Sequence, residues 1–176
     1  MILGKDINLS QILYNHSKHF DIVRSFDCGN YALNQFLFSC FNNHERVLYL
    51  FIDDNIQKIA AYSSLVCTSL IYSQESKQYQ IPAIEIKTFA VDKSYQNLPF
   101  SGNRADGVLS DSIFNSMVAT AFDLSETVIG AEYVTLYSVQ AAQSFYERNG
   151  FSVFEENMTE FYNYFNESCI PMYFEL

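Results

Sequence analysis

The chain has 176 residues, of which 49% are hydrophobic, 16% aromatic and 17% charged. This length suits a single domain over residues 1–176, and the composition excludes a chain that is disordered throughout. Twenty acidic residues against ten basic ones give a formal charge of −10. A negative field repels phosphates, so the charge argues against nucleic acid and for a cationic partner such as an amine. The alternative is that the charge only keeps the protein in solution.

The spacing of the cysteines and the pattern of apolar residues indicate the cellular compartment of the protein. The four cysteines are Cys28, Cys40, Cys67 and Cys169. Without a CxxC pair they indicate free thiols in a reducing compartment. The N-terminus lacks the apolar core of a signal peptide, and no stretch approaches the roughly 18 apolar residues of a membrane span. We therefore expect a cytoplasmic protein with no role at a membrane.

The first half of the chain predicts one helix and two strands after a polar lead-in over residues 1–28. Apolar residues recur at helical spacing over 33–41, and Asn30 is a candidate N-cap. The segments 46–52 and 59–72 are rich in strand-forming residues and predict an antiparallel pair.

The second half alternates strands with helices. We expect a loop over 74–80 and a strand over 84–91, followed by a glycine-containing loop. The remaining predicted elements are a helix over 109–122, a strand over 133–139, a short helix over 141–149 ending at Gly150, and strands over 151–154 and 171–176. This order predicts a mixed α/β chain around one sheet.

The junction between the 84–91 strand and the 109–122 helix is the most informative segment. The strand leads into a loop, and the loop leads into the N-terminus of a helix. Unpaired N–H groups and the positive end of the helix dipole make such a junction suitable for an anion, including a pyrophosphate.

Three motifs resemble the GNAT (GCN5-related) N-acetyltransferase superfamily. FAVDKSYQN, residues 89–97, is similar to the fourth strand and following loop of these enzymes. SVQAAQSFYERNGF, residues 138–151, is similar to their signature of Ala, Phe-Tyr and Gly-Phe. FDCGNYALNQFL, residues 26–37, resembles the opening of the branch that includes acetyltransferase toxins modifying aminoacyl-tRNA. The resemblance covers roughly residues 26–154.

The resemblance implies an α+β fold, with a central mixed, largely antiparallel sheet flanked by helices and a splay between strands 4 and 5. It implies acetyl-CoA as cosubstrate, no metal, and direct attack on the thioester by an amine of a small molecule, peptide or protein. Two alternatives stay open: a toxin-type enzyme acting on aminoacyl-tRNA with an antitoxin partner, and a GNAT-fold protein that binds without catalysis. A homodimer is also left open.

Two residues are the catalytic candidates. Tyr146 matches the family's general-acid tyrosine, and Phe145 beside it is expected on the packed face of the short helix. Glu85 lies six residues before Val91 in the same strand, where histone-type members carry a base glutamate. The alternatives are that Tyr146 only packs in its helix and that Glu85 pairs with Lys87.

The resemblance also assigns the cofactor-binding residues. They are Phe89, Ala90, Val91, Gln96, Asn97, Gly102, Asn103, Arg104 and Ala105. The family loop reads Gln/Arg-x-x-Gly-x-Gly/Ala, and its glycines let the backbone wrap the pyrophosphate. Here Asn103 and Ala105 take the small-residue positions, and Asn tolerates positive φ better than most residues. The loop is longer and poorer in glycine than the family pattern, which is the feature that favours the non-enzymatic alternative.

Overall fold

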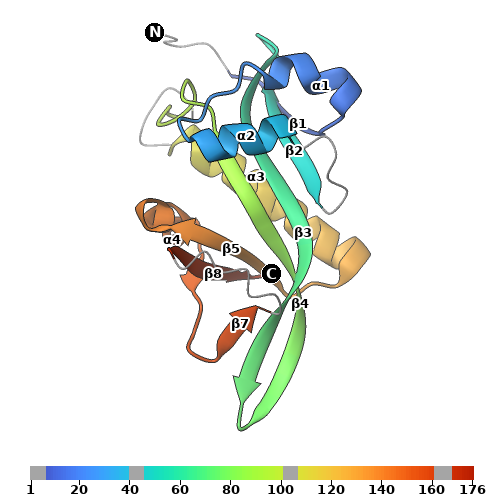
Figure 1. Cartoon of the computed structure of the whole chain (residues 1–176), viewed down its shortest axis with the longest axis vertical. Coiled ribbons are helices and arrows are strands. Elements are labelled where there is room, and N and C mark those ends of the chain that lie inside the picture. The colour runs from blue at the N-terminus through green and yellow to red at the C-terminus, as the bar shows by residue number, and fades with distance from the viewer. Residues whose placement is uncertain (1–6, 40–45, 101–106, 161–167) are drawn as a thin grey trace. The chain divides into compact units, whose positions relative to one another are not determined.

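The computed structural model describes residues 7–39, 46–100, 107–160 and 168–176 (Figure 1). The elements in chain order are β1 (Leu9–Leu13), α1 (His16–Val23), α2 (Tyr31–Ser39), β2 (Val47–Asp53), β3 (Lys58–Gln74), β4 (Lys77–Val91), α3 (Leu109–Leu124), the π-helical turn η3 (Ser125–Ile129), β5 (Tyr133–Val139), the 3₁₀ turn η4 (Gln140–Ala142), α4 (Gln143–Arg148), β6 (Ser152–Val153), β7 (Met158–Glu160) and β8 (Cys169–Glu175).

The strands hydrogen-bond in the order β1-β2-β3-β4-β5-β8-β6, and β7 pairs with β3. β4 and β5 run parallel, with a register that extends from Ala83–Tyr133 to Ile86–Leu136. β1 with β2, β5 with β8, β6 with β8 and β7 with β3 are antiparallel. This mixed sheet with its helices is the α+β fold that the sequence predicts. The parallel pairing of β4 with β5 makes the sheet mixed.

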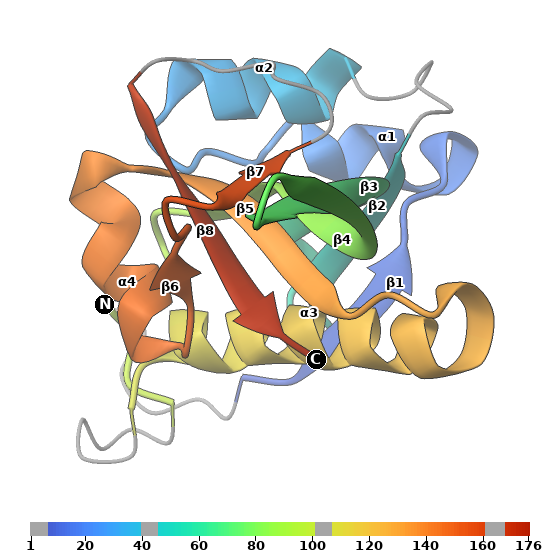
Figure 2. The ribbon, with the colours of Figure 1, turned by 90° about the horizontal axis from the view of Figure 1, so that it is seen from below.

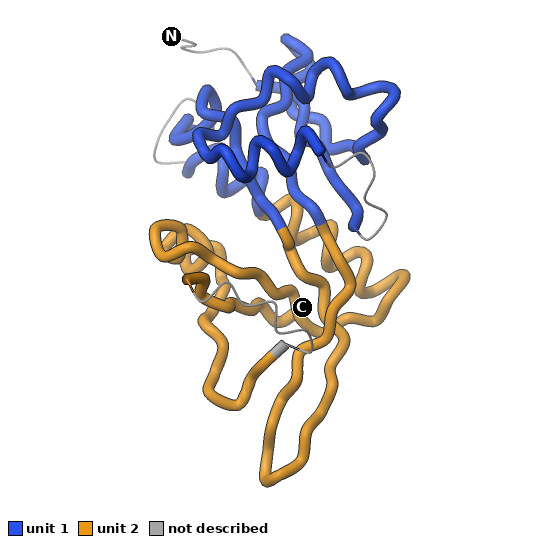
Figure 3. Tube along the Cα trace, viewed as in Figure 1, with its two compact units in different colours: residues 1–64, 88–114 blue, residues 65–87, 115–176 orange. Residues whose placement is uncertain are grey.

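The chain divides into two compact units (Figure 3). The first unit comprises residues 1–64 and 88–114, and the second comprises residues 65–87 and 115–176. β3, β4 and α3 each continue from one unit into the other, so the division does not fall at a linker. The single domain over residues 1–176 stays a prediction.

The core of the first unit is built by α1, α2 and the strands beside them. Tyr62 on β3 is fully buried, and its hydroxyl donates to the carbonyl of Leu33 at 2.8 Å. Its ring meets Phe26 edge-on at 5.3 Å and stacks on Phe36 at 6.0 Å. Phe26 and Phe36 of the 26–37 motif therefore belong to the core, whereas Tyr31 is exposed. Asn30 caps α2 as expected, because its side-chain oxygen accepts the N–H of Leu33 at 3.2 Å.

The second unit has its core beneath β5 and β8. Val134, Thr135 and Leu136 on β5 and Met172 on β8 are buried, while Tyr133 and Tyr137 on either side of the buried run in β5 are partly exposed. Successive residues of a strand point to opposite faces, so the three consecutive buried residues show that this part of β5 is covered on both faces. Figure 2 shows α4 leading by a short turn into β6, which pairs with β8.

Two parts of the element prediction are wrong. The lead-in over 1–28 contains β1 and α1, because Ile12 and Ile22 pack against the core of the first unit despite their polar neighbours. The expected loop over 74–80 is the end of a β-hairpin. Only Glu75 and Ser76 form its turn, with φ of 48° and 65°, which is the geometry of a two-residue hairpin connection.

The hairpin reads as a loop for a physical reason. All residues from 73 to 80 are exposed, so neither face of the hairpin carries the apolar alternation that identifies a strand. The short strand β7 was also not predicted; it pairs with β3 across three residues.

Candidate functional site

Asp92 organises the chain where β4 ends in the first unit. Its carboxylate is buried and accepts hydrogen bonds from Lys58 Nζ at 2.8 Å, the Ser94 N–H at 2.9 Å and the Asp27 N–H at 3.1 Å. Desolvation is the largest influence and acts to raise the pKa of Asp92. The hydrogen bonds from Lys58, Ser94 and the backbone outweigh it and hold the pKa below its ordinary value. Asp92 is therefore a structural anchor for the start of the loop.

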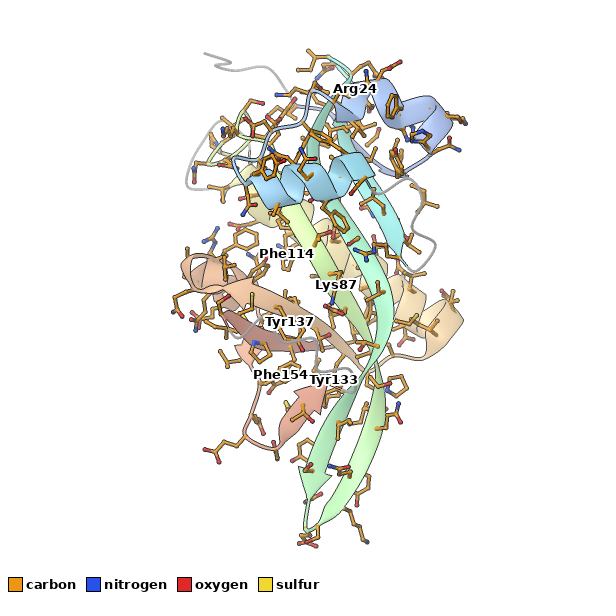
Figure 4. The ribbon with its side chains drawn as sticks, viewed as in Figure 1. Arg24, Lys87, Phe114, Tyr133, Tyr137 and Phe154 are labelled. Carbon is orange, nitrogen blue, oxygen red and sulfur yellow. The ribbon has the colours of Figure 1, made fainter. Side chains whose placement is uncertain are left out.

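The three predicted cofactor residues on β4 use their side chains for packing. Ala90 and Val91 are buried. The ring of Phe89 meets that of Phe114 on α3 edge-on at 5.1 Å. Phe114 is labelled in Figure 4. A cofactor arm lying along this strand would accordingly be recognised by main-chain groups.

The described part of the loop begins with the other two predicted cofactor residues. Gln96 donates its side-chain amide to the carbonyls of Val91 and Cys28, at 2.8 and 3.0 Å. Asn97 has φ of 58°, a left-handed conformation that Asn adopts more readily than most residues. The conformation that we expected at Asn103 stays a prediction, because that residue lies outside the described residues. The predicted residues Gly102, Asn103, Arg104 and Ala105 lie outside the described residues.

The two ends of the loop are joined at its base. The N–H of Phe100 donates to the carbonyl of Gly107 at 3.0 Å, and the N–H of Leu109 donates to the carbonyl of Leu98 at 2.8 Å. Asp111 places an acidic side chain in the first turn of α3. Because the Leu109 amide is bonded and a carboxylate stands near the positive helix end, an anion here depends on other amides of the loop and helix start.

Glu85 in the second unit is 5% exposed and forms an ion pair with Lys87 Nζ at 2.9 Å. Lys87 is labelled in Figure 4. The pairing with Lys87 that we weighed as an alternative is therefore present. Glu85 is the register partner of Thr135 on β5, so their side chains lie on the same face of the sheet. The Thr135 hydroxyl is buried and has no hydrogen-bond partner among the described residues.

Tyr146 lies on α4 and is half-buried, with its ring 5.1 Å from that of Phe145 and 6.3 Å from that of Phe151. Desolvation raises the pKa of the Tyr146 phenol to about 12. The phenol is therefore protonated at neutral pH and serves as a hydrogen-bond donor.

The spacing of the Phe-Tyr and Gly-Phe pairs has a conformational reason. The Tyr146 carbonyl accepts the N–H of Phe151 at 3.1 Å, which turns the chain sharply after α4. Gly150 sits in this turn with φ of 89°, and a Cβ at this position would lie 3.1 Å from the ring of Phe174. Both the conformation and the space favour glycine.

The expectation that Phe145 belongs to the packed face of its helix is wrong. α4 contains no buried residue, and the guanidinium of Arg148 lies 4.8 Å from the centre of the Phe145 ring. The buried aromatic residue of the motif is Phe151, which is 3% exposed. A six-residue helix has too little surface to bury a full apolar face, so the packing residue is the one that follows the turn.

Sequence reasoning missed three residues that the structure brings to these sites: Asp27, Asn34 and Thr135. Asp27 and Asn34 lie inside a motif that marked them, but the motif alone gave them no role. Thr135 carried no signal, because a threonine in an apolar strand is ordinary. Within the described residues, no three His, Cys, Asp or Glu side chains gather as a metal site, and no helix is both long and apolar enough to span a bilayer.

No protein-family model and no curated protein sequence matches the chain. Solved structures do match. A crystal structure of a bacterial toxin superposes with a TM-score of 0.75 at 18% identity, covering 96% of this chain and 91% of that one. A mutant of the toxin AtaT, bound to the C-terminus of the antitoxin AtaR and acetyl-CoA, has a TM-score of 0.67 at 19% identity, with 97% and 94% covered. AtaT complexed with acetyl-methionyl-tRNAfMet has a TM-score of 0.66 at 19% identity, with 88% and 94% covered.

Likeness at this level of identity shows the fold. The strand order, the parallel pairing of β4 with β5 and the near-complete coverage all agree on it. The chain has the GNAT fold that the sequence motifs predict, as found in the matching structures of bacterial toxins such as AtaT.

Proposed function

We propose that this protein is an acetyl-CoA-dependent N-acetyltransferase of the toxin type, with the α-amino group of an aminoacyl-tRNA as acceptor. The observation that carries the proposal is the match of 88% of the chain to AtaT in complex with acetyl-methionyl-tRNAfMet. The 26–37 motif supports it, because it resembles the opening of the toxin branch and its residues Leu33, Phe36 and Leu37 attach α2 to the core.

The reaction needs few groups from the protein. The neutral amine attacks the thioester carbonyl carbon, a C–N bond forms, and the C–S bond breaks to release the coenzyme A thiolate. One proton leaves the amine and one reaches the sulfur. A hydrogen-bond donor already oriented towards the charge that develops in the transition state lowers the activation free energy of the transfer.

Tyr146 is the proposed donor to the sulfur. With a pKa of about 12, its phenol is a weaker acid than an ordinary thiol, whose pKa is near 8.5. Complete proton transfer from the phenol to the thiolate is therefore uphill. Tyr146 acts in this proposal by a charge-assisted hydrogen bond to the developing thiolate, and the final proton comes from solvent.

The state of Glu85 bears on the acceptor. One of its carboxylate oxygens is bound to Lys87, which makes Glu85 a poorly prepared base. An α-amino group has an ordinary pKa near 7.7–8.0 and is partly neutral at pH 7, whereas a lysine-type amine near 10.4 is almost wholly protonated. The site therefore favours an α-amino group, as on an aminoacyl-tRNA or a peptide N-terminus, over an alkyl amine.

The formal charge of −10 is unevenly spread. The first unit carries seven basic and nine acidic residues, a balance of −2, and the second carries three basic and eleven acidic residues, a balance of −8. Repulsion of phosphate is thus concentrated in the second unit. The first unit, which contains the proposed cofactor residues from Phe89 to Ala105, is close to neutral.

The acidic second unit favours a second candidate function, acetylation of a small cationic amine or a peptide N-terminus. One competition experiment separates the two. Labelled acetyl-CoA is offered with an aminoacyl-tRNA mixture, a polyamine and a peptide of free N-terminus, each alone and together. We expect label on the aminoacyl-tRNA first, and none with a deacylated tRNA control. Label on the polyamine or peptide alone would support the second candidate, and no binding of acetyl-CoA would exclude both.

A further inference from the structure

We propose that Asp27 is a positioning residue for the loop that follows β4, and through that loop for coenzyme A. The inference rests on the proposed function, because that function assigns the cofactor to the loop. It gives a role to the 26–37 motif beyond the packing of its apolar residues.

The main-chain N–H and the main-chain carbonyl of Asp27 both form hydrogen bonds to the start of the loop. Its N–H donates to Asp92 Oδ2 at 3.1 Å, and its carbonyl accepts the N–H of Lys93 at 2.9 Å. Asp92 and Lys93 are the first two residues after β4. A residue 65 positions earlier in the chain therefore holds the first turn of the loop.

The carboxylate of Asp27 fixes the same place from a second direction. One oxygen accepts the Gly29 N–H at 2.8 Å and the Asn34 side-chain amide at 2.9 Å. The other oxygen pairs with Lys93 Nζ at 2.9 Å. The side chain thus connects the N-terminus of α2 to the loop while its own backbone is held at Asp92.

Cys28 and Gln96 form a second connection. The Gln96 side-chain amide donates to the Cys28 carbonyl at 3.0 Å, and the Cys28 N–H donates to the Asn34 side-chain oxygen at 3.0 Å. The side chain of Asn34 therefore accepts a hydrogen bond from Cys28 and donates one to Asp27, the two residues that contact the loop. Asn34 lies four residues after Asn30, the N-cap of α2, and therefore belongs to the first turn of this helix.

Gly29 is favoured by this arrangement. It has φ of 89°, and a Cβ there would lie 2.9 Å from the side chain of Lys93. The positive φ favours glycine, whereas the close contact is with the end of the flexible Lys93 side chain, which can move aside. The sequence Asp-Cys-Gly is therefore the part of the motif that contacts the loop.

External support of this kind suits a loop that is poor in glycine. A loop that is held before the ligand arrives loses less conformational freedom on binding, so the affinity rises. We therefore infer that the affinity for acetyl-CoA depends on Asp27 although Asp27 makes no contact of its own with the cofactor in this proposal.

The test uses the whole chain, with Asp27→Ala to remove the carboxylate and Asp27→Asn as the conservative variant that keeps an oxygen for Gly29 and Asn34. Asp54→Ala is the matched control, because Asp54 is also a hydrogen-bonded carboxylate of the first unit, bonded to Ser10 and not to the loop. Two quantities are measured: hydrogen exchange of the amides of residues 93–100 without ligand, and the dissociation constant of acetyl-CoA by calorimetry.

We expect Asp27→Ala to speed amide exchange in residues 93–100 and to raise the dissociation constant of acetyl-CoA by about tenfold or more. The dissociation constant of Asp27→Asn should stay within about threefold of the parent value, and Asp54→Ala should change neither quantity. Unchanged exchange, or faster exchange with unchanged affinity, would overturn the positioning role and leave the proposed function standing. A parent protein that does not bind acetyl-CoA at all would overturn both.

Discussion

Glu85 on β4 and Thr135 on β5 are register partners on one face of the sheet, and the Thr135 hydroxyl beside that carboxylate is buried without a hydrogen-bond partner among the described residues. A buried hydroxyl that lacks a partner costs free energy, and threonine and valine have nearly the same shape. Thr135→Val should accordingly raise the free energy of unfolding, by about 1 kcal/mol, or about 2–4 °C in Tm for a chain of this size.

Thermal melts of Thr135→Val and of Thr135→Ser measure this effect. The serine variant keeps the hydroxyl and loses a methyl group, so it should be less stable than the parent. A destabilised valine variant would mean that the hydroxyl is hydrogen-bonded in solution, for example to a water that also reaches Glu85.

The effect of Glu85 on the rate of acetyl transfer is expected to depend on pH, because it depends on the protonation of the acceptor amine. If Glu85 assists deprotonation of the amine, Glu85→Gln lowers the rate most at low pH, and its effect shrinks as pH rises and the amine loses its proton unaided. The effect should be larger for a polyamine than for an α-amino acceptor, because the latter is already partly neutral at pH 7. Parallel pH–rate profiles for the parent and the variant on both acceptors check this, and superimposable profiles would remove Glu85 from the mechanism.

Phe151 and Phe145 offer a matched pair for stability. Phe151 is buried and its ring lies 5.5 Å from that of Phe174, whereas Phe145 is only half-buried. Phe151→Ala should cost about 3–5 kcal/mol in the free energy of unfolding, the usual range for a buried phenylalanine, and Phe145→Ala clearly less. Denaturant titrations of the two variants decide the order; equal losses would show that Phe145 is packed more tightly in solution.

Asp27 should titrate far below an ordinary carboxyl group. The hydrogen bond from Lys93 is the largest cause that lowers its pKa, from 3.8 to about 2, followed by the bonds from Asn34 and Gly29. Since the pKa of the folded state is depressed, the contribution of Asp27 to stability is present above about pH 4 and is lost as pH falls through about 2. Carbon-13 NMR of the Asp27 carboxyl group should show a midpoint near pH 2.

Two variants test the cause of that shift. Lys93→Met should move the Asp27 midpoint up towards 3.8, and Asn34→Ala should move it up by less. An Asp27 midpoint that Lys93→Met leaves in place would show that the ion pair seen at 2.9 Å is not maintained in solution.

The fold could be read from the sequence where apolar periodicity and motif coincide. The strand over 133–139 was predicted from its run of strand-forming residues, and the start of the helix at 109 was predicted because that helix carries a regular apolar stripe. The hairpin turn at Glu75–Ser76 could not be predicted, since residues 73–80 around it are all exposed and follow no apolar pattern.

Within the candidate sites, too, features made by neighbouring residues could be predicted and contacts between distant segments could not. The resemblance to the GNAT signature singled out Tyr146, Gly150 and Phe151, and this was possible from one sequence because the turn between α4 and β6 lies within six residues. The bond from Asp27 to Asp92 and the pairing of Glu85 with Thr135 join distant segments, and a single sequence contains no local signal for such contacts. The pair of Glu85 with Lys87, two residues apart on one strand, could be weighed in advance for the opposite reason.

Tyr146→Phe tests the central claim most directly. Removing the hydroxyl deletes the proposed donor to the departing sulfur and leaves the ring in place, so single-turnover transfer from acetyl-CoA to aminoacyl-tRNA should slow by about 10²–10⁴. The dissociation constant of acetyl-CoA and the Tm should stay close to the parent values, and the slowing should be constant from pH 6 to about pH 10, because the phenol with a pKa of about 12 keeps its proton throughout. A Tyr146→Phe enzyme that transfers acetyl at the parent rate, with parent affinity, would contradict the account.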